Sequence, residues 1–189
     1  GVTWQRRIPM LRNTVMEINV KDLLVVVDVY SINKAIQRDK SDTRLDYRAY
    51  LNHAKQDDIL LRALAYGYNT RKEIVTFKDC LQRYGYQVYL RDIFQSQKNP
   101  HKIIYIPNHV RVALDVMEII HQGKVNKVVL GANDPNYIDL VQHLKSKGIE
   151  VEIFCNNVPN ALRNAASTCR DFTDELLLTG IIVDGKKAE

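Results

Sequence analysis

Short apolar runs alternate with amphipathic segments along most of this chain, and this alternation constrains the fold more than any other feature. Apolar runs that are rich in β-branched residues and too short for helices predict buried strands, here at residues 23–27, 59–66, 86–90, 125–130 and 151–154. Between them, apolar residues recur three or four positions apart, which predicts helices, here at 73–84, 110–121, 137–147 and 161–169. The order strand, helix, strand predicts a three-layer, Rossmann-like α/β fold, with a mostly parallel sheet of about five strands and helices on both faces.

The chain has the length and composition of one folded domain. Its 189 residues are 46% hydrophobic and 26% charged, a balance typical of globular proteins. We expect an N-terminal extension at 1–20, a single domain at 21–183 and a mobile charged tail at 184–189. Within the domain, the polar stretch 37–55 is expected to be an insertion and residues 95–101 an exposed loop.

The charge and the cysteine content of the chain limit which ligands, metal sites and cellular compartments are expected. The net charge of +5 is compatible with a polyanionic ligand but does not by itself indicate one. Three widely spaced cysteines without a CxxC pair argue against a disulfide framework or a zinc site. No run of 18 apolar residues and no signal-peptide core is present, so we expect a cytoplasmic protein without a membrane span. The extension at 1–20 is a candidate contact for a second copy or a protein partner.

Two acidic residues are predicted to end neighbouring strands. Asp28 follows the first apolar run and Asn33 comes five residues later, while Asp134 follows the run at 125–130. In parallel sheets, ligands bind at the carboxyl ends of the strands, where these side chains would meet. Paired carboxylates suit Mg²⁺ or Mn²⁺, which activates water for attack on a phosphodiester. The alternative is that both aspartates cap the helices that follow them.

Five segments together resemble a known nuclease family in the correct order. The resemblance is to NYN (LabA-like) domains of the PIN-like superfamily, and it covers residues 22 to 178. The opening strand motif hhhDxxN is similar to 25–33, and the motif hhhSGDxDFxxLV is similar to 127–141, with Ala132-Asn133 in place of Ser-Gly and Asn136 in place of the second Asp. Weaker matches lie at 63–67, 148–154 and 160–174.

The resemblance implies a divalent-metal-dependent endoribonuclease that uses a cluster of acidic residues. By position, Asp28 and Asp134 inherit catalytic, metal-binding roles with Mg²⁺ or Mn²⁺, and Asn33 inherits a supporting role. Asn136 occupies an acidic position but offers only a neutral oxygen. The implied substrate is RNA, which we expect to be single-stranded.

A larger departure from the family lies at the start of the helix at 110–121. The family's acidic residue is replaced by Arg111, and Asp115 follows on the same helical face one turn later. Three interpretations remain open. Asp115 replaces the missing metal ligand and catalytic acid, or the Arg111 guanidinium neutralises the acidic pair in place of the cation, or Arg111 and Asp115 form an ordinary surface ion pair.

Basic and aromatic residues offer a candidate RNA surface, because single strands are bound by phosphate neutralisation and base stacking. The residues that we predict to bind RNA are Arg71, Lys72, Tyr68 and Arg91, and a wider set of candidates comprises Arg44, Arg48, Tyr50, Lys98, His101 and Lys102.

Functions of other classes are also open. A catalytically weakened PIN-like domain could serve as an RNA-binding or assembly module. A haloacid dehalogenase-type phosphatase requires a second Asp two residues after Asp28, where Tyr30 stands, and no GxGxxG follows the first strand as a dinucleotide site requires. A receiver-like or other flavodoxin-like binding domain remains compatible with the pattern.

Overall fold

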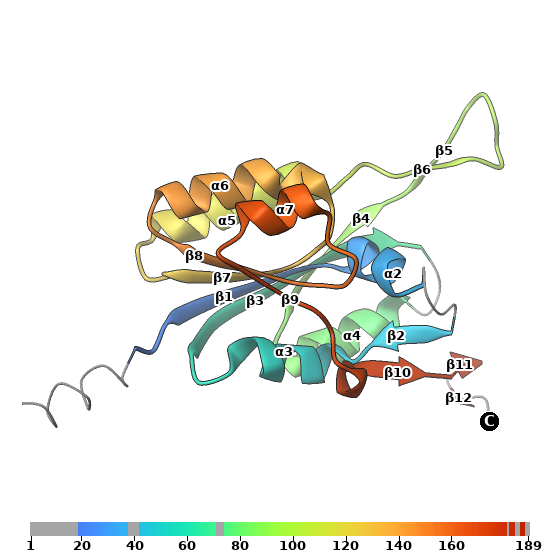
Figure 1. The fold of residues 1–189 in the computed structure, drawn as a ribbon. Coiled ribbons are helices and arrows are strands. Elements are labelled where there is room, and N and C mark those ends of the chain that lie inside the picture. The colour runs from blue at the N-terminus through green and yellow to red at the C-terminus, as the bar shows by residue number, and fades with distance from the viewer. Residues whose placement is uncertain (1–18, 38–41, 71–73, 181, 184–185, 188–189) are drawn as a thin grey trace, which may run out of the picture.

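A six-stranded sheet forms the centre of the computed structural model, which describes residues 19–37, 42–70, 74–180, 182–183 and 186–187. The strand order is β4-β3-β1-β7-β8-β9, and every neighbouring pair is parallel (Figure 1). The strands are β1 (Asp22–Asp28), β3 (Ile59–Asn69), β4 (Gln87–Asp92), β7 (Lys127–Gly131), β8 (Glu150–Phe154) and β9 (Thr168–Arg170). The five predicted strands are thus confirmed, and β9 adds a sixth.

Helices cover both faces of the sheet, which confirms the three-layer α/β prediction. On one face lie α3 (Tyr47–Lys55) and α4 (Ile74–Tyr84). On the other lie α5 (His109–His121), α6 (Ile138–Ser146) and α7 (Asn160–Ala165) (Figure 1). The helix predicted at 161–169 is wrong in its second half. The backbone turns extended at Ala166, and the next residues pair with β8, where Arg170 forms an ion pair with Glu152 at 2.7 Å.

β1 is a central strand, and later strands are added to the sheet first on one side of it and then on the other. Leu23 through Val27 are fully buried, as expected of a strand covered on both faces. β3 and β4 lie to one side of β1, whereas β7, β8 and β9 lie to the other. The carboxyl ends of β1 and β7 therefore flank a topological switch point, the place where open α/β sheets bind ligands.

The remaining elements lie at the edges of this framework. α2 (Val29–Gln37) begins directly after β1. β2 (Thr43–Leu45) pairs with β10 (Leu177–Thr179), β5 (Phe94–Gln95) with β6 (Ile103–Ile104), and β11 (Ile182–Val183) with β12 (Lys186–Lys187), all antiparallel. The single-turn helices are η1 (Pro135–Tyr137) and η2 (Asp174–Leu176). The predicted insertion at 37–55 thus contains β2 and α3.

Two predicted segments fall largely outside the described residues. Only 19–20 of the extension and 186–187 of the tail are described. Within the described part of the chain, no helix is long and apolar enough to span a membrane.

Gly131 ends β7 where a side chain would collide with the core. A Cβ atom at this position would lie 2.7 Å from the Tyr50 hydroxyl and 3.0 Å from Val27 Cγ1. Tyr50 is fully buried and its hydroxyl donates to the Phe154 carbonyl at 2.9 Å, so it cannot move aside freely. The absence of a side chain at 131 therefore lets β7, α3 and β8 pack together just before the switch point.

We expect Gly131→Ala to lower the free energy of unfolding by about 1–3 kcal/mol, the usual effect of overpacking a rigid core. Urea denaturation measures this change. Gly67→Ala is the matched control, because its nearest neighbour would be the Leu90 side chain at 3.3 Å. The explanation is wrong if both variants lose the same stability.

Candidate functional site

Asp28 is held in a fixed orientation at the carboxyl end of β1. Its side chain is 7% exposed. Oδ1 accepts a hydrogen bond from the Ser31 backbone N–H at 3.1 Å, and Oδ2 accepts one from the Tyr137 hydroxyl at 2.6 Å. The first bond closes the initial turn of α2, so the predicted capping role is confirmed for Asp28.

Asp134 follows β7 and is the N-cap of η1. Its Oδ1 accepts hydrogen bonds from the backbone N–H and from the side-chain amide of Asn136, both at 2.9 Å. Capping is thus confirmed for Asp134 as well. Asn136 is exposed and orients Asp134 through these two contacts.

The two aspartates interact electrostatically across the switch point. Burial raises the pKa of the Asp28 carboxyl above its ordinary value, and the negative charge of Asp134 raises it further, although the hydrogen bonds from Tyr137 and Ser31 oppose the rise. Asp28 and Asp134 thus lie at or beyond the carboxyl ends of the neighbouring parallel strands β1 and β7, near enough for the charge of Asp134 to affect the pKa of Asp28. Two carboxylates in this arrangement repel each other unless a cation or a proton is shared between them.

Three polar residues hold the loops around Asp28, namely Tyr137, Ser31 and Asn133. None of them was predicted from the sequence to have this role. The Ser31 hydroxyl donates to Asn133 Oδ1 at 2.8 Å and accepts from the Asn133 backbone N–H at 2.9 Å. Tyr137 stands at the Phe position of the family motif. Its hydroxyl, which Phe lacks, was the only sequence feature that could have indicated a hydrogen bond to an acidic residue.

Asp115 and Arg111 form an ion pair on α5. Asp115 Oδ2 accepts hydrogen bonds from Arg111 Nε at 3.1 Å and from the Tyr66 hydroxyl at 2.8 Å. Arg111 is 53% exposed, so its guanidinium is in the surface pair and not between Asp28 and Asp134. Among the described residues, no three His, Cys, Asp or Glu side chains gather closely enough to hold a metal ion.

The fold and these contacts can be compared with known proteins. The NYN domain family model matches residues 22–176. The chain belongs to the NYN domain family. No curated protein matches the chain in sequence. A protein of unknown function from Vibrio parahaemolyticus has a similar structure, with a TM-score of 0.70, 21% sequence identity, and coverage of 85% of this chain and 98% of that chain. NYN domains are members of the PIN-like nuclease superfamily.

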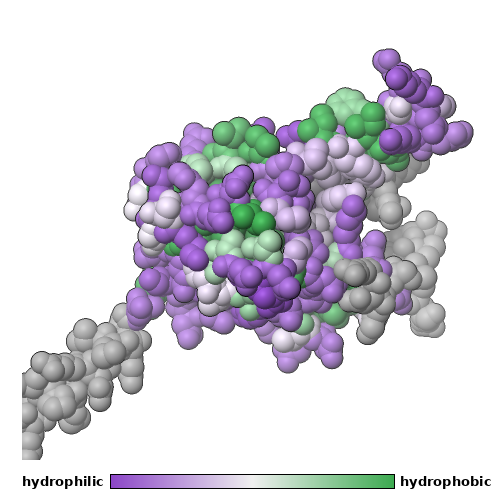
Figure 2. All heavy atoms as spheres, turned by 45° about the horizontal axis from the view of Figure 1, so that its top comes forward, coloured by the Kyte–Doolittle hydropathy of each residue, from purple (hydrophilic) through white to green (hydrophobic). Residues whose placement is uncertain are grey.

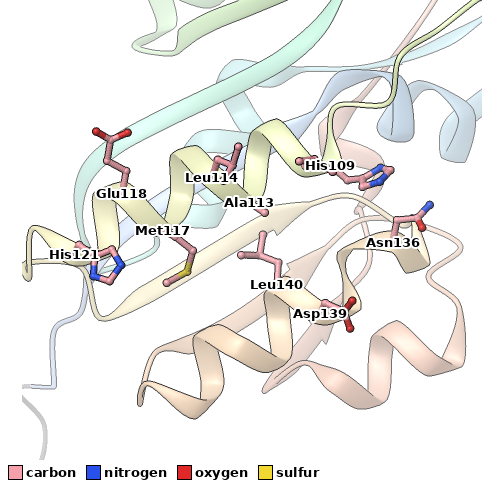
Figure 3. Close-up of a pocket in the computed structure, with 10 residues that line it drawn as sticks. His109, Ala113, Leu114, Met117, Glu118, His121, Asn136, Asp139 and Leu140 are labelled. Atoms are coloured by element: carbon pink, nitrogen blue, oxygen red, sulfur yellow. The ribbon is translucent and has the colours of Figure 1, made fainter.

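In this NYN domain, Asn33 lies half-buried in α2, more than a turn beyond Asp28. Asn136 also borders a groove of about 550 Å³ between α5 and α6, with a mainly apolar lining. Figure 3 shows His109 and Asn136 at one end of this groove, with Met117 and His121 at the other. The His109 ring packs edge-on against Tyr137 at 6.4 Å. One end of the groove therefore lies beside Tyr137, whose hydroxyl donates to Asp28.

The predicted RNA-binding residues of the NYN domain have different surroundings. Tyr68 is 6% exposed and its hydroxyl donates to the Ile106 carbonyl at 2.7 Å, so stacking of a base on its ring is ruled out in this conformation. Tyr50 is also buried and is wrong as a surface candidate. Burial raises the pKa of Tyr68 to about 12, and the nearby positive charge of Arg91 opposes the rise. Arg91 is half-exposed at the end of β4, and Arg71 and Lys72 lie outside the described residues.

The raised pKa of Asp28 predicts that Asp28→Asn stabilises the domain at neutral pH in the absence of divalent ions. A carboxyl whose pKa is higher in the folded state than its ordinary 3.8 stabilises the fold below that value, and this contribution is lost as the pH rises through the folded pKa. Asn removes the buried charge and keeps an acceptor for Ser31, and its amide can donate to the Tyr137 hydroxyl in place of the bond that Oδ2 now accepts. The melting temperature of Asp28→Asn should therefore exceed that of the wild type at pH 7, and the difference should shrink towards pH 3.5.

Asp57→Asn removes one charge from an exposed position, and its melting temperature should follow the wild type across the same range. The prediction is wrong if the difference in melting temperature, Asp28→Asn minus wild type, is lower at pH 7 than at pH 3.5. The ionised carboxylate would then not be destabilised in the fold.

Proposed function

We propose that the protein is a divalent-metal-dependent endoribonuclease of the PIN-like NYN type, with a site centred on Asp28 and Asp134. The observation that supports this most directly is the position of Asp28 and Asp134 at the carboxyl ends of the neighbouring parallel strands β1 and β7, and the charge of Asp134 contributes to the raised pKa of Asp28. Family membership supports the same chemistry, because the chain matches the NYN model over residues 22–176.

The donor set fits Mg²⁺ or Mn²⁺. These ions prefer oxygen ligands, use few protein groups and keep several waters. Asp28 and Asp134 would hold the ion, and Asn136 would add a neutral side-chain oxygen. When bound, the ion would supply an activated water and offset negative charge that develops on phosphate oxygens.

Asp115 would act as a third acidic residue at the margin of the site, and not as a ligand grouped with Asp28 and Asp134 in the present conformation. Its link to Asp28 runs through Tyr66, whose backbone pairs with Asp28 in the sheet and whose hydroxyl donates to Asp115. Arg111 would act beside it by attracting the phosphate backbone, since its guanidinium is half exposed. Tyr137 and Ser31 would keep the Asp28 oxygens in position, and Asn33, one turn further along α2, would have a supporting polar role.

The experiment is a cleavage assay on single-stranded RNA of mixed sequence, in linear and circular form, with Mn²⁺, with Mg²⁺ or with EDTA. We expect cleavage only with a divalent ion, and we expect circular RNA to be opened, which an exonuclease cannot do. Equal cleavage in EDTA would contradict the proposal.

One observation favours a second candidate function. Arg111 and Asn136 stand where the family has acidic residues, and Arg111 already neutralises Asp115. These replacements are compatible with an RNA-binding or assembly module that has lost most of its cleavage activity. Metal-independent binding of RNA without any cleavage in Mn²⁺ would favour this candidate.

A further inference from the structure

An arm formed by residues 93–106 leaves the carboxyl edge of the sheet at the end of β4, two strands from β1. It follows β4 directly, and its two short strands pair as Phe94 with Ile104 and Gln95 with Ile103. Figure 1 shows the arm projecting well beyond the helices and the sheet. Hydrogen bonds close its tip, from Ser96 N–H to the Lys102 carbonyl and from Lys102 N–H to the Asn99 carbonyl, both at 2.9 Å. The sequence predicted only an exposed loop here.

The surface of the arm combines apolar and basic side chains. Four large apolar residues are between 42% and 51% exposed, namely Phe94, Ile103, Ile104 and Ile106. Figure 2 shows these hydrophobic atoms along the arm and hydrophilic atoms at its tip. Within residues 93–106 the charged side chains are Lys98 and Lys102, and there is no Asp or Glu. The charge of the arm therefore complements a polyanion and not another basic surface.

A cluster of three tyrosines connects the foot of the arm to the turn that follows Asp28. Tyr105 packs against Tyr68 and Tyr30, with ring centroids 5.0 and 5.2 Å apart. Tyr30 is only two residues beyond Asp28, and the Lys34 ammonium lies 4.5 Å from the centre of its ring. Tyr30 and Tyr105 keep part of their surface exposed, unlike Tyr68. Aromatic and basic groups thus continue from the arm to the acidic pair.

We propose that the arm, together with Tyr30 and Tyr105, binds single-stranded RNA and guides the strand to Asp28 and Asp134. The role of the acidic pair in this inference rests on the function proposed above, whereas binding by the arm does not. Lysines at the tip would neutralise phosphates, and Phe94 would stack on an unpaired base, the usual combination for single strands. A duplex offers no unpaired base face, so the arm is expected to favour single strands.

The test measures binding of a fluorescently labelled 12-nucleotide oligouridylate in EDTA, where cleavage cannot interfere. We expect the double variant Lys98→Glu/Lys102→Glu to bind at least about tenfold more weakly. The slope of log affinity against log salt should fall by about 1.4, because each lost phosphate contact removes about 0.7 for single strands. Lys145→Glu/Lys147→Glu is the matched control, since it changes the charge equally at exposed positions of α6 and its C-cap.

Phe94 variants separate stacking on a base from contact with a protein. Phe94→Tyr should retain affinity for the oligonucleotide, whereas Phe94→Leu, which stays apolar, should lose about tenfold. Equal losses for the arm and α6 charge variants would overturn the inference, because charge alone would then explain binding. The inference would also be overturned if the arm variants kept the RNA affinity of the wild type but sedimented as monomers where the wild type sediments as a dimer. The arm would then be assigned to contact with a second copy.

Cleavage distinguishes failure of the arm from failure of the proposed activity. Hydrolysis of a dinucleotide by the unmodified protein in Mn²⁺ reports the proposed activity separately from RNA binding by the arm. If the wild type cleaves the dinucleotide and the arm variants bind RNA normally, the RNA-binding role of the arm is wrong and the nuclease proposal stands. If the arm variants lose RNA binding but the wild type cleaves no RNA, the RNA-binding role of the arm stands and the nuclease proposal is wrong.

Discussion

Asp28→Asn and Asp134→Asn should each reduce Mn²⁺-dependent cleavage of RNA by about a hundredfold or more. Each change removes one of the two negative charges that would hold the cation, while the cation would supply most of the charge stabilisation in the reaction. Because the two carboxylates would act on one ion, the double variant should lose little more activity than either single variant.

Both substitutions are conservative for the fold, which makes the loss interpretable. Asn is as good an N-cap as Asp, so the bonds from Ser31 to position 28 and from Asn136 to position 134 retain an acceptor. Circular dichroism and melting curves verify folding. Asp57→Asn, an exposed change near the start of β3 at the opposite edge of the sheet, should keep full activity. Full activity in both site variants would remove Asp28 and Asp134 from the site.

The framework of the sheet could be predicted from the sequence because burial determines residue type there. β1 is covered on both faces, and the run from Leu23 to Val27 has no polar residue. β9 could not be predicted in the same way. It is three residues long at the edge of the sheet, and its pairing depends on contacts such as that of Arg170 with Glu152, 18 positions away.

The same distinction applies to the site. The positions of Asp28 and Asp134 after β1 and β7 could be predicted because each aspartate follows an apolar run. The contacts around them were not, because the Tyr137 hydroxyl reaches Asp28 across 109 positions and Ser31 reaches Asn133 across 102. Tyr68 was misassigned to the RNA surface for a related reason. Residue type suggests stacking, but only the packing of Tyr30 and Tyr105 around it determines that its ring is covered.

The pair of Arg111 and Asp115 raises the question of how far the proposed site is weakened. Arg111 brings a positive charge to a position where the family has an acid, and it engages the Asp115 carboxylate. Asn136, in turn, donates its amide to Asp134 instead of adding a charge. Both replacements reduce the negative potential of the site, and cation affinity depends strongly on the number of charged ligands.

Arg111→Asp/Asn136→Asp should therefore increase affinity for Mn²⁺ by about tenfold or more. The midpoint of the Mn²⁺ titration of cleavage should move to lower concentration, and Mn²⁺ should raise the melting temperature more than in the wild type, because a ligand stabilises the state that binds it. Arg111→Gln is the control that removes the positive charge without adding a carboxylate, and it should produce only part of the gain. Without metal, the new repulsion between positions 111 and 115 should slightly destabilise α5. If the double variant gains no affinity, α5 does not contribute to cation binding, and Asp115 no longer belongs to the proposed site.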